Sequence, residues 1–491
     1  MTTRSPTAPR AAARSIEAAN GEDRPIRFGT SGWRGALGEE VTFDRLRVLV
    51  RSVSEWMHEA AVDRRVLVGW DTRFASAEMA ETSAAILAEF GLIPLLSQVV
   101  TPTPAVTFAL AHDDYAGALV LTASHNPALD HGLKVFGPHG GTIDEATARR
   151  IEAIAQRRRH ETGPALATPV PRRVDFLAPY RAALDALLDH EAFARIPVSI
   201  CYDAMHGSGG GIFDAVLEDA GARIRRLRCQ PDPTFGGHSP DPIPERLTEL
   251  SRETRRAAGL TLGLATDGDG DRVGVVDGRG RVLSETQVVA LLIDHLARAG
   301  RIERGVAITA GTGSLVLKVA ASHGLPVERH PVGFKYLSAA MASGRADVAG
   351  EESGGFALAS IGRDKDGLLA GCLLANLVAT SGEALETHVD RLERRFGASA
   401  CGRRAISRTP ELDLALDHLV RNPPDSVGGV AVESVEGGDS LRLELSDGGF
   451  LMLRRSGTEP MIRLYSEAGH DAALIQRLDA GQGLLGMPQT G

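Results

Sequence analysis

The chain has 491 residues, of which 43% are hydrophobic and 24% are charged, and its formal net charge is −9. This length predicts several domains of roughly 100 to 200 residues, with the composition of an ordinary soluble globular protein. The net negative charge excludes a general nucleic-acid binder, which would carry basic stripes, although local basic pockets remain compatible with it.

Cysteine usage and the N-terminal sequence indicate the compartment. The four cysteines stand far apart without a CxxC spacing, so neither a disulfide framework nor a zinc site is expected. Residues 1–24 lack the apolar segment of a secretory signal and are interpreted as a disordered tail. The most apolar helix-like run, 368–379, is too short to cross a bilayer and is interpreted as a core helix. We therefore expect a cytoplasmic protein without a membrane partner.

Strand–helix–strand units recur three times along the chain. In each unit the helix ends at a glycine (Gly91, Gly221, Gly324), as expected for a C-cap, and the next strand runs into a proline. Three related α/β modules with largely parallel sheets explain this most simply, although any such units look alike. The expected elements are 66–71, 75–90 and 93–99; then 198–203, a helix to 220 and a strand to 227; then 306–311, a helix to 322 and a strand to 331.

The last part of the chain has a different pattern. Four strand-like runs and a final helix predict an α+β domain, and Asp447-Gly448-Gly449 is typical of the turn between its two middle strands. The expected strands are 430–435, 440–445, 450–454 and 461–466, and the expected helix is 472–485.

Composition changes along the chain suggest the domain boundaries. A proline-rich linker at 163–171 ends the first module, the second ends shortly after an aspartate-rich loop, and the third ends with the charged helix before Gly397. The expected domains are 25–162, 172–282, 283–398 and 403–491.

Ser124 lies at the end of an expected buried strand, 118–121, in the stretch Thr122-Ala-Ser-His-Asn-Pro127. Pro127 cannot continue the strand, so the hydroxyl is presented at a strand end. A turn residue is the ordinary interpretation of an isolated serine in such a stretch, and a nucleophile is the alternative. A second stretch, rich in aspartate, favours the nucleophile.

The aspartate stretch is Asp267-Gly-Asp-Gly-Asp-Arg272, between expected strands at 260–265 and 273–276. It is not an EF-hand, because the required sixth-position glycine and twelfth-position glutamate are replaced by Arg272 and Gly278. At a hairpin tip, alternating side chains place the three carboxylates on one face, where they repel unless a cation lies between them. Such oxygen ligands suit Mg²⁺, whereas a solvated acidic turn is the alternative.

Lysine is rare in this chain: only four of the 54 basic side chains are lysines. In an arginine-rich protein a lysine can mark a place that needs a compact ammonium, and three of the four fall in motif-like loops. Chance placement explains the pattern equally well. The lysines are Lys134, Lys318, Lys335 and Lys365.

Five stretches in order resemble the motifs of the α-D-phosphohexomutase family, the phosphoglucomutases and phosphomannomutases. The resemblance covers nearly all of the chain after residue 25. It implies three mixed α/β domains in series and a smaller α+β C-terminal domain around a central cleft. The five stretches are Phe28–Gly35, Thr122–Pro127, Asp267–Arg272, Gly350–Gly355 and Arg454–Pro460.

The resemblance implies phosphoryl transfer through a phosphoserine at Ser124, with Mg²⁺ held by Ser124 and the three aspartates, Asp267, Asp269 and Asp271. In this family the serine passes its phosphoryl group to a hexose monophosphate, and the resulting bisphosphate turns round and returns the other phosphate. Positioning and electrostatic stabilisation dominate such chemistry. The other catalytic residues implied are Arg34, His125, Lys134 and Arg272, with Lys134 as general acid/base or charge neutraliser.

The same resemblance implies the substrate-binding residues. Glu351 and Ser353 are expected to contact sugar hydroxyls, with Lys335 nearby. A guanidinium fork, hydroxyls and a flexible backbone are expected to bind the distal phosphate. The residues of this phosphate-binding set are Arg454, Ser456, Gly457, Thr458 and Arg463.

The expected activity is therefore interconversion of hexose 1- and 6-phosphates, with glucose 1,6-bisphosphate as intermediate and activator. Gly355, where phosphomannomutase-like members commonly have histidine, and Gly333-Phe-Lys335 favour a phosphoglucomutase with phosphomannomutase activity; a phosphoglucosamine mutase is the alternative. A metal-dependent phosphatase and a non-catalytic sugar-phosphate binder are more distant alternatives. The expected partners are small hexose phosphates, in a monomer or homodimer.

Overall fold

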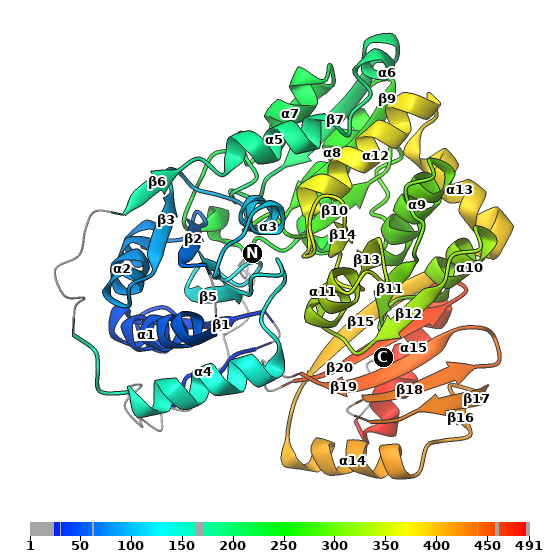
Figure 1. Ribbon diagram of the computed structural model, residues 1–491. Helices are drawn as coiled ribbons and strands as arrows, with labels where there is room; N and C mark the ends of the chain where they lie inside the picture. Colours follow the sequence, from blue (N-terminus) through cyan, green and yellow to red (C-terminus); the bar gives the residue numbers. More distant parts are fainter. Residues whose placement is uncertain are drawn as a thin grey trace, which may run out of the picture.

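We describe a computed structural model of the chain, in which three α/β modules and a C-terminal domain follow one another (Figure 1). The expected mixed α/β architecture is confirmed. The structure describes residues 24–29, 31–60, 63–163, 171–438, 440–456 and 461–487. The tail at 1–23, most of the expected linker (164–170) and four residues of the expected phosphate-binding loop (457–460, with Gly457 and Thr458 among them) lie outside the described residues.

The first module is built on a six-stranded sheet of order β1-β5-β4-β2-β3-β6. Four helices accompany it, and β6, which follows the expected linker, pairs with β3 and extends the sheet. The strands are β1 (Trp33–Ala36), β2 (Arg65–Trp70), β3 (Ile93–Ser97), β4 (Gly117–Leu121), β5 (Asp130–Phe136) and β6 (Arg172–Val174), and the helices are α1 (Phe43–Ala60), α2 (Ser76–Glu89), α3 (Thr103–His112) and α4 (Glu145–Arg157).

The second module has a four-stranded sheet of order β10-β9-β7-β8. Its strands are β7 (Val198–Asp203), β8 (Arg223–Leu227), β9 (Leu260–Thr266) and β10 (Val273–Val276). Its helices are α5 (Leu177–Asp185), α6 (His190–Arg195), α7 (Phe213–Asp219) and α8 (Thr248–Arg256), with short 3₁₀ turns at Phe235–Gly237 and Pro244–Arg246.

The third module has a sheet of order β12-β11-β13-β14. Its strands are β11 (Val306–Thr309), β12 (Val327–His330), β13 (Val348–Gly350) and β14 (Phe356–Leu358). Its helices are α9 (Glu285–Arg298), α10 (Ser314–Ser322), α11 (Phe334–Ala342), α12 (Gly367–Ser381) and α13 (Leu385–Phe396).

One four-strand arrangement is common to the three sheets. The orders β3-β2-β4-β5, β8-β7-β9-β10 and β12-β11-β13-β14 correspond strand by strand, with three parallel strands and one antiparallel strand at the end. The sheets are thus less parallel than expected, because the last strand follows its neighbour through a short loop that cannot make a parallel crossover. The expected glycine caps are confirmed: Gly91, Gly221 and Gly324 all have positive φ.

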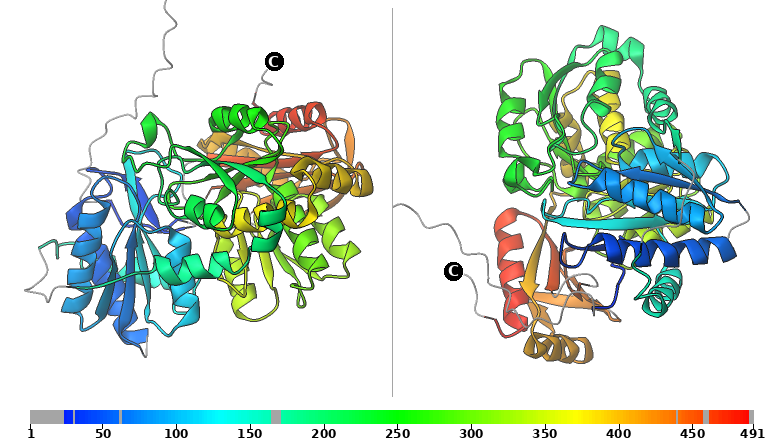
Figure 2. Two further views of the ribbon diagram at one scale, coloured as in Figure 1. Left: turned by 90° about the horizontal axis from the view of Figure 1, so that it is seen from above. Right: turned by 90° about the vertical axis from the view of Figure 1, so that its left-hand side faces the viewer.

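The C-terminal domain is an antiparallel sheet of order β15-β20-β19-β18-β17-β16 with two helices. Figure 2 shows α15 covering one face of this sheet. The strands are β15 (Ala400–Ser407), β16 (Ser426–Val427), β17 (Val430–Glu436), β18 (Ser440–Leu445), β19 (Phe450–Arg455) and β20 (Met461–Ala468), and the helices are α14 (Pro410–Arg421) and α15 (Asp471–Leu484). The four expected strands and the final helix are confirmed.

The second and third modules share one hydrophobic core, in which α12 is almost completely buried. The expectation of a core helix at 368–379 is therefore confirmed. Among the described residues no single helix is long and apolar enough to cross a membrane, and α12 and α13 pass such a test only as a pair bent by 91°. Because the two modules pack through a common core, the loops that they contribute are held in fixed relation.

Candidate active site

Three loops at corresponding positions of the three modules carry the predicted chemistry. Each connects the third strand of the shared arrangement to the antiparallel fourth: residues 122–129, 267–272 and 351–355. We call them the serine loop, the metal loop and the sugar loop. Arg272 and Gly355 form an isolated antiparallel bridge between the metal and sugar loops, and Ser124 contacts the metal loop. The fold thus brings together motifs that are more than 200 residues apart.

Ser124 is fully buried and its hydroxyl donates a hydrogen bond to Asp267 Oδ2 at 2.7 Å. Its φ of 53° is left-handed, a conformation that non-glycine residues rarely adopt and that often marks a functional site. The backbone N–H of Ser124 donates to Thr122 Oγ1 at 2.8 Å, and the Thr122 hydroxyl donates to Asp71 Oδ2 at 2.6 Å. These bonds hold the serine hydroxyl toward the metal loop.

Arg73 holds the backbone of the serine loop, a role that the sequence analysis did not predict. Its guanidinium donates to four backbone carbonyls of this region, those of Ser124, Asn126, Pro127 and Asp130, at 2.7 to 2.9 Å. Its Nε lies 3.2 Å from Asp71 Oδ2, and both side chains are fully buried. The available signal was the pair of opposite charges directly after the apolar strand β2.

Arg73 also connects two modules. Its guanidinium lies over the ring of Phe235, 4.8 Å from the centroid, in the second module. Phe235 is buried and has a left-handed φ of 51°. A cation over an aromatic face is attracted by the ring quadrupole, more strongly when water is excluded. The geometry of the serine loop therefore depends on the first and second modules together.

The three aspartates of the metal loop converge as predicted: oxygens of Asp267, Asp269 and Asp271 all lie within 4.8 Å of one another. All three side chains are buried. Lys134 Nζ lies 2.5 Å from Asp269 Oδ2 and 2.6 Å from Asp271 Oδ2, and the Thr103 hydroxyl donates to Asp269 at 2.6 Å. Burial opposes the charge on Lys134, but the two carboxylates outweigh it and raise its pKa.

Mg²⁺ fits this donor set. Oδ1 of Asp269 and Oδ1 of Asp271 are buried and have no hydrogen-bond partner among the described residues. Burial, Asp271 and Asp269 raise the pKa of Asp267 well above its usual value. A hard cation bound by carboxylate oxygens would satisfy these atoms and stabilise the ionised form of Asp267. The cluster has the number and type of ligands that Mg²⁺ takes from a protein.

Two predicted arginines and His125 surround the serine. Arg34 donates to Asn126 Oδ1 of the serine loop at 3.1 Å, and burial lowers its pKa. Arg272 Nη1 lies 3.8 Å from Asp241, and neighbouring carboxylates raise its pKa against the opposing effect of burial. Burial and nearby cations, Arg272 first among them, hold the pKa of His125 well below its usual value. His125 is therefore neutral at pH 7 in this positive environment.

The sugar loop brings together Glu351 and Ser353, whose hydroxyl donates to the Glu351 carboxylate. Lys365, which was not among the predicted site residues, lies 3.3 Å from Asp271 and 3.8 Å from Glu351 and is 4% exposed. It therefore links the sugar and metal loops. The scarcity of lysine was the signal that could have identified it.

Gly355 makes room for Lys365. A Cβ atom at position 355 would lie 2.5 Å from Lys365 Cδ and 2.9 Å from Glu351 Oε1, so a side chain there would displace Lys365 or Glu351 from its present position. The predicted Lys335 begins α11, and its Nζ lies 3.9 Å from Glu145 and 5.1 Å from the ring centroid of Tyr336. Lys365 thus lies beside the carboxylate expected to bind sugar, whereas the contacts of Lys335 are with its neighbour Tyr336 and with α4 of the first module.

The described members of the predicted phosphate-binding set, Arg454, Ser456 and Arg463, lie on or directly beside the C-terminal sheet. Arg454 on β19 is paired in register with Arg463 on β20, so the two side chains share a face of the sheet. Ser456 is buried, and its N–H donates to Met461 O at 2.8 Å. Arg454 lies near enough to Glu352, the second glutamate of the sugar loop, for its charge to lower the carboxyl pKa that burial raises.

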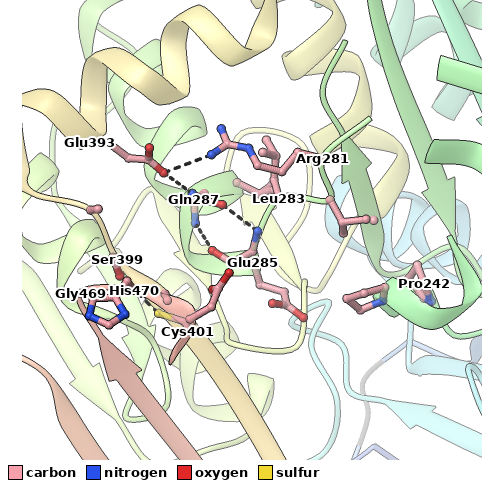
Figure 3. Close-up of a pocket in the computed structure, with 18 of the residues that line it drawn as sticks. Pro242, Arg281, Leu283, Glu285, Gln287, Glu393, Ser399, Cys401, Gly469 and His470 are labelled. Atoms are coloured by element: carbon pink, nitrogen blue, oxygen red, sulfur yellow. Dashed lines mark hydrogen bonds and ion pairs between the residues drawn. The ribbon is translucent and has the colours of Figure 1, made fainter. Parts of the chain in front are cut away.

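A separate pocket of about 490 Å³ lies where the second and third modules meet the C-terminal domain (Figure 3). Glu393 accepts a hydrogen bond from Gln287 at 2.6 Å there and lies 3.6 Å from Arg281. None of the predicted site residues lines this pocket. It is distinct from the cluster around Ser124.

Comparison with known proteins agrees with this geometry. Four family models match in order, described as phosphoglucomutase/phosphomannomutase α/β/α domains I, II and III and C-terminal domain, over residues 25–162, 178–280, 284–396 and 386–481.

Individual relatives match nearly the whole chain. A phosphoglucosamine mutase of Mycobacterium ulcerans is 30% identical, over 91% of this chain and 96% of that protein. A phosphoglucomutase/phosphomannomutase of Thermococcus kodakarensis is 26% identical, over 93% and 98%. A crystal structure from Thermus thermophilus, named for a phosphomannomutase, has a TM-score of 0.82 and 30% identity, over 94% of this chain and 100% of that one. The chain belongs to the phosphoglucomutase/phosphomannomutase family of the α-D-phosphohexomutase superfamily.

Proposed function

We propose that the protein interconverts hexose 1-phosphate and hexose 6-phosphate through a phosphoserine at Ser124 and a hexose 1,6-bisphosphate. The observation that carries this proposal is the buried contact between the Ser124 hydroxyl and Asp267, 2.7 Å long, beside two further aspartates and Lys134. A metal-dependent phosphatase can also use a serine, but water must reach its phosphoserine, and a mere binder needs no such serine. In a mutase, burial protects the phosphoserine from hydrolysis.

The residues around Ser124 position and neutralise the transferring group. Asp267 accepts a hydrogen bond from the Ser124 hydroxyl and so fixes its direction. Mg²⁺ held by the three aspartates and Ser124 would stabilise negative charge on the phosphoryl oxygens. Lys134 is charged through its contacts with two carboxylates, which favours charge neutralisation over general acid/base work. Arg34 and Arg272 add positive charge from two sides.

The remaining predicted residues select and orient the substrate. We assign contacts with sugar hydroxyls to Glu351 and Ser353, and binding of the phosphate remote from Ser124 to the C-terminal domain. The paired arginines of β19 and β20 support the second assignment, because adjacent guanidinium forks suit a phosphate dianion. The proposed phosphate-binding set is Arg454, Ser456, Gly457, Thr458 and Arg463.

Glucose phosphate is the proposed substrate, with mannose phosphate second. Lys365 places an ammonium group 3.8 Å from the Glu351 carboxylate, and we assign Lys335 a second ammonium near the bound sugar; such charges disfavour a cationic amino sugar by like-charge repulsion. Glucosamine phosphate is the alternative substrate, ranked third, and it is kept because several relatives at 30% identity are phosphoglucosamine mutases.

Measuring kcat/KM for glucose, mannose and glucosamine 1-phosphates, with Mg²⁺ and a trace of hexose 1,6-bisphosphate, tests the proposal. We expect isomerisation in the order glucose, mannose, glucosamine. A preference for glucosamine 1-phosphate would overturn the substrate assignment but not the assignment of mutase activity. Release of free phosphate without isomerisation would instead indicate a phosphatase.

A further inference from the structure

The sheet of the C-terminal domain presents a row of arginines on one face. Arg403 on β15 is paired with Tyr465, and Ala405 is paired with Arg463, which in turn is paired with Arg454. Paired residues in neighbouring strands point to the same face, and side chains two residues apart on one strand do so as well. Arg403 therefore shares a face with Arg454 and Arg463. We call this the inner face.

The inner face is turned toward the other domains. Phe450, Met452 and Tyr465, which belong to it, pack against Ala310 and Val332 of the third module. The charge of Arg454 acts on Glu352 of the sugar loop, and the charge of Arg403 acts on His125, the neighbour of Ser124. The row of arginines thus extends from the sugar loop toward the serine loop.

Arg403 differs from the residue that follows it. Its side chain is exposed, and its guanidinium makes no hydrogen bond or ion pair with any residue that the structure describes. Arg404 points to the opposite face, where it donates to Asp479 at 2.6 Å and to Gln482 of α15. A guanidinium fork without a partner among the described residues, on the face of the sheet that turns toward the other domains, has binding capacity left for an anion.

We propose that Arg403 holds the hexose bisphosphate at the site between its two phosphoryl transfers. The inference rests on the proposed function, in which the intermediate must turn round before it can return its second phosphate. During this turn both phosphates leave the residues that bound them. Arg403 belongs neither to the Ser124 cluster nor to the Arg454–Arg463 pair, so it can bind a phosphate in transit and reduce escape of the intermediate.

The experiment follows the intermediate directly. Enzyme phosphorylated with ³²P on the serine is mixed with unlabelled glucose 1-phosphate in a single turnover, and free labelled bisphosphate is separated from labelled monophosphate. We expect Arg403→Gln to release about tenfold more bisphosphate per turnover than wild type, as for loss of one charge-assisted hydrogen bond. Arg403→Lys keeps the charge without the fork and should lie between the two. Saturating glucose 1,6-bisphosphate should restore most of the steady-state rate of Arg403→Gln.

Arg404→Gln is the matched control, because it removes the same charge one position along the strand on the opposite face. Equal release by wild type and Arg403→Gln would overturn the inference while leaving the mutase mechanism in place. Equal release by the two glutamine variants would also overturn it, since the effect would then be a general one on the domain. A wild-type enzyme that forms no phosphoserine would overturn the proposed function itself.

Discussion

The cluster around Ser124 and the inner face of the C-terminal sheet are built in opposite ways. In the cluster, Ser124, Asp269 and Lys134 are at most 2% exposed, and each side chain makes at least one polar contact of 2.5 to 2.7 Å. On the inner face, Arg403 is exposed, and neither its guanidinium nor Arg454 Nε has a hydrogen-bond partner among the described residues. The cluster is thus organised before the ligand arrives, whereas the inner face keeps groups that a ligand can satisfy. Variants of the two regions should fail in different ways.

Removing the serine hydroxyl should have the largest effect. Ser124→Ala deletes the proposed phosphoryl carrier, so turnover should fall by about a thousandfold or more. Intact-protein mass spectrometry should find one phosphoryl group on wild type and none on the variant. Ser322→Ala, on the surface helix α10, is the control and should keep both the label and the activity. Full activity of Ser124→Ala would contradict the mechanism.

Removing the metal should have the second-largest effect on turnover. EDTA should stop turnover, and Asp269→Asn should lower it by about a hundredfold or raise the Mg²⁺ concentration that it needs. Because a ligand that binds only the folded state stabilises it, Mg²⁺ should raise the Tm of wild type and raise that of Asp269→Asn less. Asp219→Asn, at an exposed position at the end of α7, should respond as wild type does. Undiminished rates in EDTA would contradict the assignment of the site.

Arg73 offers a test of whether the serine loop is organised before the ligand binds. Arg73→Met removes the donors to four backbone carbonyls and leaves Asp71 without its cation, so we expect a loss of about 3 kcal/mol in the free energy of unfolding without any ligand. Urea unfolding measures this loss.

A double-mutant cycle with Phe235→Leu refines the Arg73 test. Phe235→Leu alone should lower the free energy of unfolding by less than Arg73→Met does. A coupling energy of about 1 kcal/mol between the two positions would measure the contact between the first and second modules. Strictly additive effects would show that the aromatic contact contributes nothing.

Arg454→Ala should have the smallest effect on the free protein. Its guanidinium makes few contacts, so the free energy of unfolding should change by less than about 0.5 kcal/mol. The KM for hexose phosphate should nevertheless rise about tenfold or more, because a bidentate phosphate contact is lost. Arg408→Ala, in the turn after β15, is the control for a loss of charge. A stability loss as large as that of Arg73→Met would erase the distinction between the two regions.

Local sequence patterns predicted much of this structure. Periodicity and turn residues located the strands and helices, and the alternation of Asp267, Asp269 and Asp271 predicted that their carboxylates share a face. Lys365 could not be placed in the same way, because its contact with Asp271 depends on how β14 and α12 meet. Arg73 acts on backbone carbonyls, which no motif records. Packing between domains decides which face of the C-terminal sheet turns inward. In the sequence alone, nothing therefore distinguished Arg403 from other strand residues.

The repeated use of one loop position bears on how such proteins diversify. The serine loop, the metal loop and the sugar loop are equivalent corners of three similar sheets, yet each has a separate duty in the proposed reaction. A mutation in the third corner can alter the preferred sugar without disturbing the transfer chemistry in the first two. Selection can therefore change specificity in small steps while the reaction is preserved. Such stepwise change would produce relatives of similar identity to this chain that are named for different sugars, as the two relatives above are.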